Sequence, residues 1–257
     1  MSLVKNMEQK TVLITGALGR LGSAFARSIV ALEGRVFLID LDEVKCRQFV
    51  DELEPRRADF LVADITNVDG IQKSIQSCLD RFGSIDAVVH AAYPHSAGWG
   101  ATLENLQPNQ LFEDLNKQLG GAILLSQQVI QQFQQQGFGH LIHISSIQGI
   151  AAPKFKHYEG TDMNSPIEYS AIKSGVIAVT KWLAKKYRQQ NIRVNCISLG
   201  GILDQQPKSF LAHYQSSCNS KGMLNAEDVA GALLYLLSNQ SQFVTGHNLV
   251  VDDGWSL

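Results

Sequence analysis

Seven short apolar runs, rich in β-branched residues, alternate with stretches that have the apolar spacing of helices. The runs are residues 11–15, 36–40, 60–63, 87–90, 141–144, 192–197 and 248–251. The helical patterns cover residues 21–32, 43–53, 68–81, 110–135, 167–190 and 226–237. Strands that alternate with helices predict βαβ units and a buried parallel sheet. Right-handed crossovers then give an α/β fold, a Rossmann-like doubly wound sheet with helices on both faces.

Composition narrows the class of protein. The 257 residues, 45% of them hydrophobic, suit one domain over residues 1–257. The 22 basic and 24 acidic residues nearly cancel, so neither nucleic acid nor a membrane surface is an expected partner. Four scattered cysteines indicate free thiols and no zinc site. With no apolar leader in residues 1–10 and no long apolar run, we expect a cytoplasmic protein.

A glycine-rich turn follows the first run and contains Gly16, Gly19 and Gly22. Gly16 would permit the tight turn, Gly19 a close approach to a pyrophosphate, and Gly22 close packing of helix on strand. The helix that begins here would point free N–H groups at the phosphates. The pattern therefore predicts a dinucleotide site, although a plain glycine turn is the alternative.

Asp40 ends the second run, where a carboxylate can accept hydrogen bonds from the adenosine ribose. It would repel a 2′-phosphate, so NAD is favoured over NADP as the cofactor. The adjacent cation Arg20 would tolerate that phosphate, and Asp40 could instead cap the next helix, a role also open to Asp42. Asp64 and Ile65 follow the third run and are candidates to flank the adenine.

Ser145 and Ser146 end the fifth run, and Tyr169 and Lys173 follow one helical turn apart. Residues 165–168 read as a capping box with proline at the first helical position, so this helix should start near Pro166. A nearby ammonium lowers the pKa of a phenol, which then serves as an acid–base group at neutral pH. A serine hydroxyl can hold the substrate oxygen during hydride transfer.

Taken together, the chain resembles a short-chain dehydrogenase/reductase over nearly all its length. The resemblance is carried by the glycine turn, the Tyr169/Lys173 pair and residues 90–93, 143–146, 192–198, 200–202 and 245–254. It implies that Ser146 is the catalytic serine, that Lys173 also binds the nicotinamide ribose, and that Ile202 lies near the carboxamide. Leu21, Ala91, Ala92 and Tyr169 are implied cofactor contacts. Members with this tail are commonly homodimers or homotetramers.

The chain departs from the family pattern at four places. The glycine spacing is that of the extended branch, and residues 90–93 read His-Ala-Ala-Tyr where Asn-Asn-Ala-Gly is usual. Gln118 aligns with the asparagine that holds a proton-relay water, with Asn116 as the other candidate. Leu199 replaces a proline before Gly200. The altered relay position makes Gln118 a candidate catalytic residue.

The interval between Ser146 and Tyr169 is longer than the family usually shows. Its extra residues, 153–163, offer Tyr158, Glu159 and Asp162 as hydrogen-bonding groups for a small polar, hydroxylated substrate. The insert resembles that of oxidoreductases associated with flagellin glycosylation and surface-sugar biosynthesis. A plain surface loop is the alternative.

Three functions are compatible with these motifs. The first is an NAD(P)-dependent oxidoreductase that interconverts a secondary alcohol and a ketone, with a sugar or sugar phosphate as a candidate substrate. The second is an epimerase or dehydratase for sugar nucleotides that retains its NAD. The third is a non-catalytic NAD-binding scaffold. A metal enzyme is not expected, because His140 and His143 would face opposite sides of a strand.

Overall fold

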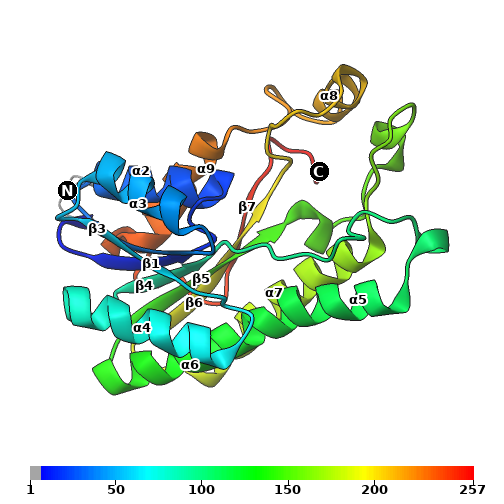
Figure 1. Ribbon diagram of the computed structural model, residues 1–257. Helices are drawn as coiled ribbons and strands as arrows, with labels where there is room; N and C mark the ends of the chain where they lie inside the picture. The colour runs from blue at the N-terminus through cyan, green and yellow to red at the C-terminus, as the bar shows by residue number, and fades with distance from the viewer. Residues whose placement is uncertain (1–6) are drawn as a thin grey trace.

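Seven parallel strands form one sheet in the order β3-β2-β1-β4-β5-β6-β7 in the computed structural model, which describes residues 7–257 (Figure 1). The strands are β1 (Thr11–Thr15), β2 (Arg35–Asp40), β3 (Ala58–Val62), β4 (Ala87–His90), β5 (Gly139–Ser146), β6 (Ile192–Leu199) and β7 (Asn248–Val251). The order reverses between β1 and β4, and a ligand crevice opens at such a point, at the carboxyl ends of the strands. The predicted doubly wound sheet is confirmed.

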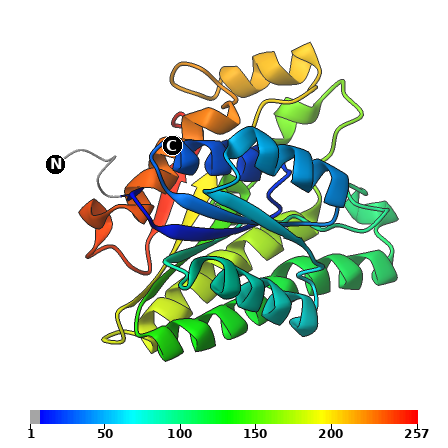
Figure 2. The same ribbon diagram turned by 60° about the vertical axis from the view of Figure 1, so that its left-hand side comes forward.

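Helices cover both faces of the sheet (Figures 1 and 2). On one face lie α2 (Arg20–Val30), α3 (Glu43–Leu53) and α9 (Ala226–Leu237), and on the other α4 (Val68–Phe82), α6 (Gly121–Gln136) and α7 (Ile167–Lys186). Each face has its own apolar core, and every residue of β1 is buried. This two-sided burial explains why the strands read as continuous apolar runs.

Local side chains fix where several helices begin and end. The Asp42 carboxylate accepts the Lys45 N–H at the start of α3, and Asn67 accepts the Gly70 N–H at the start of α4. Asn225 begins α9 with a capping box. Such caps satisfy N–H groups that the helix itself leaves without partners.

The region predicted as one helix over residues 110–135 consists of three segments. It contains α5 (Pro108–Asp114), the π-helical stretch η2 (Leu115–Gly120) and α6. The π stretch spans the position of Gln118, and π-bulges of this kind are frequent at functional sites. Hydrophobic periodicity cannot distinguish such a stretch from a regular helix.

Two further predictions about helices are wrong. The capping box at residues 165–168 does not form: Pro166 is itself the N-cap of α7, because its backbone is extended, with ψ 141°. The Ser165 hydroxyl instead donates to the Gln148 side-chain oxygen, at 2.7 Å. The predicted helical patterns also leave out residues 191–225, which contain the helix α8 (Lys208–Gln215).

Within residues 7–257, no helix has the length and apolar character needed to cross a membrane. No group of histidine, cysteine or acidic side chains in this part of the chain could hold a metal ion. The expected absence of a leader in residues 1–10 concerns mainly residues 1–6, which lie outside the described residues.

Candidate active site

The glycine turn between β1 and α2 is shaped by close backbone contacts. Gly16 has a φ of +65°, and a Cβ there would lie 2.6 Å from the Ala92 Cα. A Cβ on Gly22 would lie 2.2 Å from the Gly16 carbonyl oxygen. Gly19 is the N-cap of α2 with no side-chain cap and no acidic residue in the first turn. The first N–H groups of α2 are therefore free to bind an anion, and the turn fits a pyrophosphate.

One cavity, of about 350 Å³, lies beside this turn and is lined by Gly16, Gly19 and residues from three strand ends. These residues include Asp40, Asp64, Ile65, Ala91 and Ala92. The structure thus brings all the predicted adenosine-side residues together.

The Asp40 carboxylate accepts the backbone N–H groups of Leu18, at 2.9 Å, and of Leu41, at 2.8 Å. Asp40 therefore holds the glycine turn in place, and Asp42 is the residue that caps α3. Asp64 accepts both the backbone N–H and the hydroxyl of Thr66, and these bonds lower the pKa of its carboxyl group.

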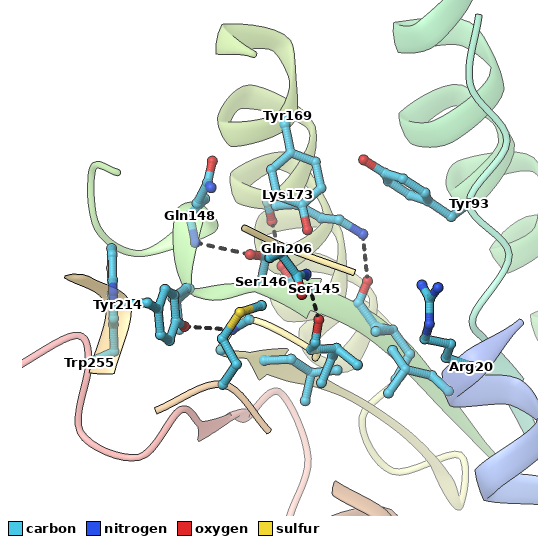
Figure 3. A pocket seen from close by; sticks show the side chains of 18 of the residues that line it. Arg20, Tyr93, Ser145, Ser146, Gln148, Tyr169, Lys173, Gln206, Tyr214 and Trp255 are labelled. Atoms are coloured by element: carbon cyan, nitrogen blue, oxygen red, sulfur yellow. Dashed lines mark hydrogen bonds between the residues drawn. The ribbon is translucent and has the colours of Figure 1, made fainter. Parts of the chain in front are cut away.

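A second cavity, of about 460 Å³, adjoins the other side of the turn and contains the catalytic candidates (Figure 3). Arg20, Leu21, Gly22, Ser146, Tyr169, Lys173 and Ile202 all line it. Gly19, Ala91, Ala92 and Tyr93 line both cavities, so the two are ends of one continuous cleft. A cleft with a phosphate cradle at its middle has the layout that a dinucleotide requires.

The two adjacent serines at the end of β5 have different partners. The Ser145 hydroxyl donates to the backbone oxygen of Lys173 at 2.9 Å, which ties β5 to α7. The Ser146 hydroxyl lies near enough to the Tyr169 phenol to lower the pKa of the phenol, and it accepts the Gln148 N–H at 3.2 Å. Both serines line the cavity, and Ser146, unlike Ser145, has its hydroxyl free of a backbone acceptor within residues 7–257; its role as the catalytic serine stays a prediction.

Tyr169 and Lys173 are deeply enclosed. Burial raises the pKa of the Tyr169 phenol, and the neighbouring Ser146 hydroxyl opposes that shift. Burial lowers the pKa of Lys173 to about 8. The Lys173 ammonium lies 5.5 Å from the centre of the Tyr169 ring and donates to the Ile144 carbonyl oxygen at 3.1 Å. In the protein alone, the expected depression of the tyrosine pKa is therefore not found.

The structure does not bring the predicted relay residues to the cavity. Gln118 is buried on η2, lines neither end of the cleft, and has no hydrogen-bond partner for either amide atom. Asn116 is exposed. The relay role of Gln118 stays a prediction.

The insert forms part of the cavity wall, as expected of a segment that supplies groups for the substrate. Tyr158 lines the cavity together with His157 and Met163, whereas Glu159 and Asp162 are exposed. The suggestion that both acids face the active site is wrong, because their side chains are exposed and do not line the cavity.

This wall is an aromatic cluster formed by three distant parts of the chain. His157 of the insert packs on Tyr214 of α8, at 5.5 Å between ring centres, and on Trp255, at 5.9 Å. The Lys154 ammonium donates to the Trp255 carbonyl oxygen at 2.8 Å. Phe210 and Tyr214, four residues apart after Pro207, carry the sequence signal that could have revealed α8.

One ion pair joins the two rims of the cleft. The Arg20 guanidinium at the start of α2 pairs with the Asp204 carboxylate, in the segment between β6 and α8. The charge of Arg20 is therefore directed toward Asp204, and Arg20 does not line the cavity that contains Asp40.

This fold and cleft define a class of protein. A family profile described as enoyl-(acyl carrier protein) reductase matches residues 16–256. The chain belongs to the short-chain dehydrogenase/reductase family, a class of NAD(P)-dependent oxidoreductases, and the resemblance is confirmed.

Two similar proteins and one similar crystal structure illustrate the membership of this chain in the family. The post-translational flagellin modification protein A of Campylobacter coli is 42% identical, over 98% of this chain and 100% of that one. The 7alpha-hydroxysteroid dehydrogenase of Bacteroides fragilis is 29% identical, over 99% and 97%. A crystal structure of a short-chain dehydrogenase from Leptospira borgpetersenii with bound NAD+ matches with a TM-score of 0.87 and 29% identity, over 100% of this chain and 96% of that one.

Proposed function

We propose that this chain is an NAD-dependent oxidoreductase that interconverts a secondary alcohol and a ketone on a small polar substrate. The observation that carries the proposal is the meeting of Ser146, Tyr169 and Lys173 in a cavity continuous with the glycine turn. We take residues 1–257 to be one catalytic domain.

Bound in the cleft, NAD would supply the hydride acceptor for alcohol oxidation and the donor, in reduced form, for the reverse reaction. Ser146 would hold the substrate oxygen, and the Tyr169 phenol would take or give its proton. Lys173 would bind the nicotinamide ribose and, as an ammonium, would favour the phenolate form of Tyr169. The nearby Ser146 hydroxyl, which lowers the pKa of the Tyr169 phenol, supports this division of roles.

Asp40 supports the choice of NAD over NADP. Its carboxylate lines the adenosine-side cavity, where it would repel a 2′-phosphate. Arg20, the cation that could have offset this repulsion, is paired with Asp204 on the other side of the turn.

Calorimetry with both cofactors tests this assignment, and we expect NAD to bind more tightly. Asp40→Asn keeps the shape of the side chain and removes its charge, and should raise the affinity for NADP about tenfold while changing that for NAD little. If NADP binds the unmodified protein as tightly as NAD does, the assignment is wrong.

The substrate class is proposed to be a sugar or sugar phosphate. The flagellin modification protein A of Campylobacter coli supports this proposal as the most similar relative named above. Within the cavity, the hydroxyl group of Tyr158 and the amide of Gln148 offer hydrogen bonds, and the ring of Trp255 offers an apolar surface. Such mixed walls suit a hydroxylated ring.

A panel assay tests the proposed reaction. The protein with NAD is supplied with free sugars, sugar phosphates, sugar nucleotides and, as a control class, hydroxysteroids, and formation of NADH is followed by absorbance. We expect turnover with a member of the first two groups and none with Tyr169→Phe. Turnover confined to hydroxysteroids would overturn the substrate class. NAD that survives gel filtration and converts a sugar nucleotide without net NADH would favour an epimerase or dehydratase.

We also propose that the chain works in the cytoplasm as a homodimer or homotetramer. Trp182 on α7 and Ile123 on α6 are apolar and exposed, which supports self-association. Light scattering after size exclusion tests this point, and a monomeric mass at micromolar concentration would contradict it.

A further inference from the structure

Lys173 is a buried cation without an acidic partner. Its residue is 9% exposed, and none of the ion pairs within residues 7–257 includes it. Its ammonium donates to one backbone oxygen, that of Ile144. Burial makes the charged form of a lysine costly, so its remaining neighbours decide whether it keeps its proton.

The neighbours of the Lys173 ammonium are the aromatic rings of Tyr93 and Tyr169. The Lys173 ammonium lies 5.3 Å from the centre of the Tyr93 ring and 5.5 Å from that of the Tyr169 ring. The two rings are nearly perpendicular, at 85°, with centres 5.9 Å apart. Figure 3 shows the Lys173 amine reaching between the two tyrosines. Both distances fall within the range of about 6 Å in which the face of a ring attracts a cation.

The surroundings hold the Tyr93 ring in this place. Trp99 packs edge-on against Tyr93, with ring centres 5.4 Å apart, and against Tyr169, at 5.9 Å. The Tyr93 residue is 41% exposed, but partial burial of its phenol raises the pKa, and the neighbouring Tyr169, Asp114 and Glu168 raise it further. Tyr93 therefore stays neutral and acts on Lys173 through its ring.

The carboxylates of Asp114 and Glu168 act on Tyr93 but form no ion pair with Lys173, whose pKa is shifted by burial alone. His90 at the end of β4 and His143 on β5 are buried, and burial together with the charge of Lys173 lowers the pKa of both. The pKa of His143 is lowered to about 4, so it is neutral at physiological pH. Tyr169 on α7 is neutral as well.

We propose that Tyr93 is a positioning residue that, together with Tyr169, holds Lys173 as an ammonium between two aromatic rings. This inference rests on the proposed function, in which Lys173 acts in its charged form. Tyr93 occupies the fourth position of the His-Ala-Ala-Tyr segment, where glycine is usual in the family and no side chain could make this contact. The aromatic ring thereby supports a charge for which this site contains no carboxylate partner.

The titration of Lys173 tests the proposal directly. We would follow the nitrogen signal of its ammonium by NMR in the full chain, and assign that signal by its loss in Lys173→Met. Tyr93→Leu keeps apolar bulk but removes the ring, and should lower the titration midpoint by about half a unit to one unit. Tyr93→Phe keeps the ring and should leave the midpoint unchanged.

Tyr158→Leu is the matched control, because Tyr158 lines the same cavity without contacting Lys173, and its midpoint should equal that of the unmodified protein. An unchanged or raised midpoint in Tyr93→Leu would overturn the proposal, since the ring would then act only by excluding water. So would an equal shift in Tyr93→Phe and Tyr93→Leu. The measurement needs no substrate, so its failure is distinguishable from failure of the proposed oxidoreductase function.

Discussion

The two ends of the cleft are built in different ways. At the adenosine end, the shape comes from the backbone: glycines in a tight turn, free N–H groups of α2, and Asp40, which accepts hydrogen bonds from Leu18 and Leu41. At the substrate end, it comes from side chains that the insert, α8 and the segment around Trp255 bring together. Backbone geometry tolerates little change, whereas an aromatic wall can be rebuilt by substitution. We therefore expect substitutions to change the choice of substrate more readily than they change cofactor binding.

The largest expected effect comes from Tyr169→Phe, which acts where the two ends meet. It removes the proton donor and little volume, so turnover should fall at least 100-fold, or about 2.7 kcal/mol of activation free energy. NAD affinity, measured by calorimetry, should be nearly unchanged. Retention of more than a few per cent of the rate would mean that another group carries the proton.

Lys173→Met should stabilise the protein while it inactivates it. A pKa lowered from 10.5 to about 8 means that the buried ammonium costs about 3 kcal/mol below pH 8. The lost hydrogen bond to Ile144 offsets about 1 kcal/mol, so the free energy of unfolding should rise by about 2 kcal/mol at neutral pH.

The stabilisation by Lys173→Met depends on pH, because the folded and unfolded chains lose the proton of Lys173 at different pH values. Between pH 8 and 10.5, the unfolded chain holds the proton of Lys173 and the folded chain has lost it, so the stability of the unmodified protein rises with pH. The advantage of Lys173→Met should therefore shrink over that window in urea titrations. A constant advantage would show that packing, and not charge, is responsible.

A pair of glycine substitutions tests the rigidity of the adenosine end. Gly22→Ala places a Cβ against the Gly16 carbonyl oxygen, and should cost about 1–2 kcal/mol of stability and weaken NAD binding. Gly231→Ala, on an exposed turn of α9 with open space around it, should instead stabilise by about 0.5–1 kcal/mol and leave NAD binding unchanged. Tolerance of Gly22→Ala would remove the contrast between the two ends.

The smallest expected effect concerns Tyr158, which lines the cavity that contains Ser146 and Tyr169. Tyr158→Ala should raise KM about three- to tenfold, or about 1 kcal/mol, and leave NAD affinity unchanged, because its side chain lines only the substrate cavity. Glu159→Gln is the matched neighbour, and its exposed side chain should make no difference to KM. Equal KM values for the two variants would make the insert a plain surface loop.

The same contrast explains what could be predicted from the sequence. The sheet, the glycine turn and the Tyr169/Lys173 pair depend on spacing within short segments, which hydrophobic periodicity and glycine positions reveal. The aromatic wall depends on contacts between residues as far apart as His157 and Trp255, and no local pattern encodes that proximity. The acids of the insert were misplaced for the same reason, since the insert is held by contacts of His157 and Lys154 with α8 and Trp255 that the local sequence does not encode.

The position of Trp255 also has a spectroscopic consequence. Of the three tryptophans in the sequence, Trp255 is 3% exposed and lines the cavity, Trp99 packs on Tyr169, and the Trp182 side chain is 62% exposed on α7. In a Trp182→Phe background, the remaining emission comes from two indoles next to the site. Energy transfer from these indoles to NADH and quenching by a bound ligand would then report occupancy of the cleft optically, without any turnover.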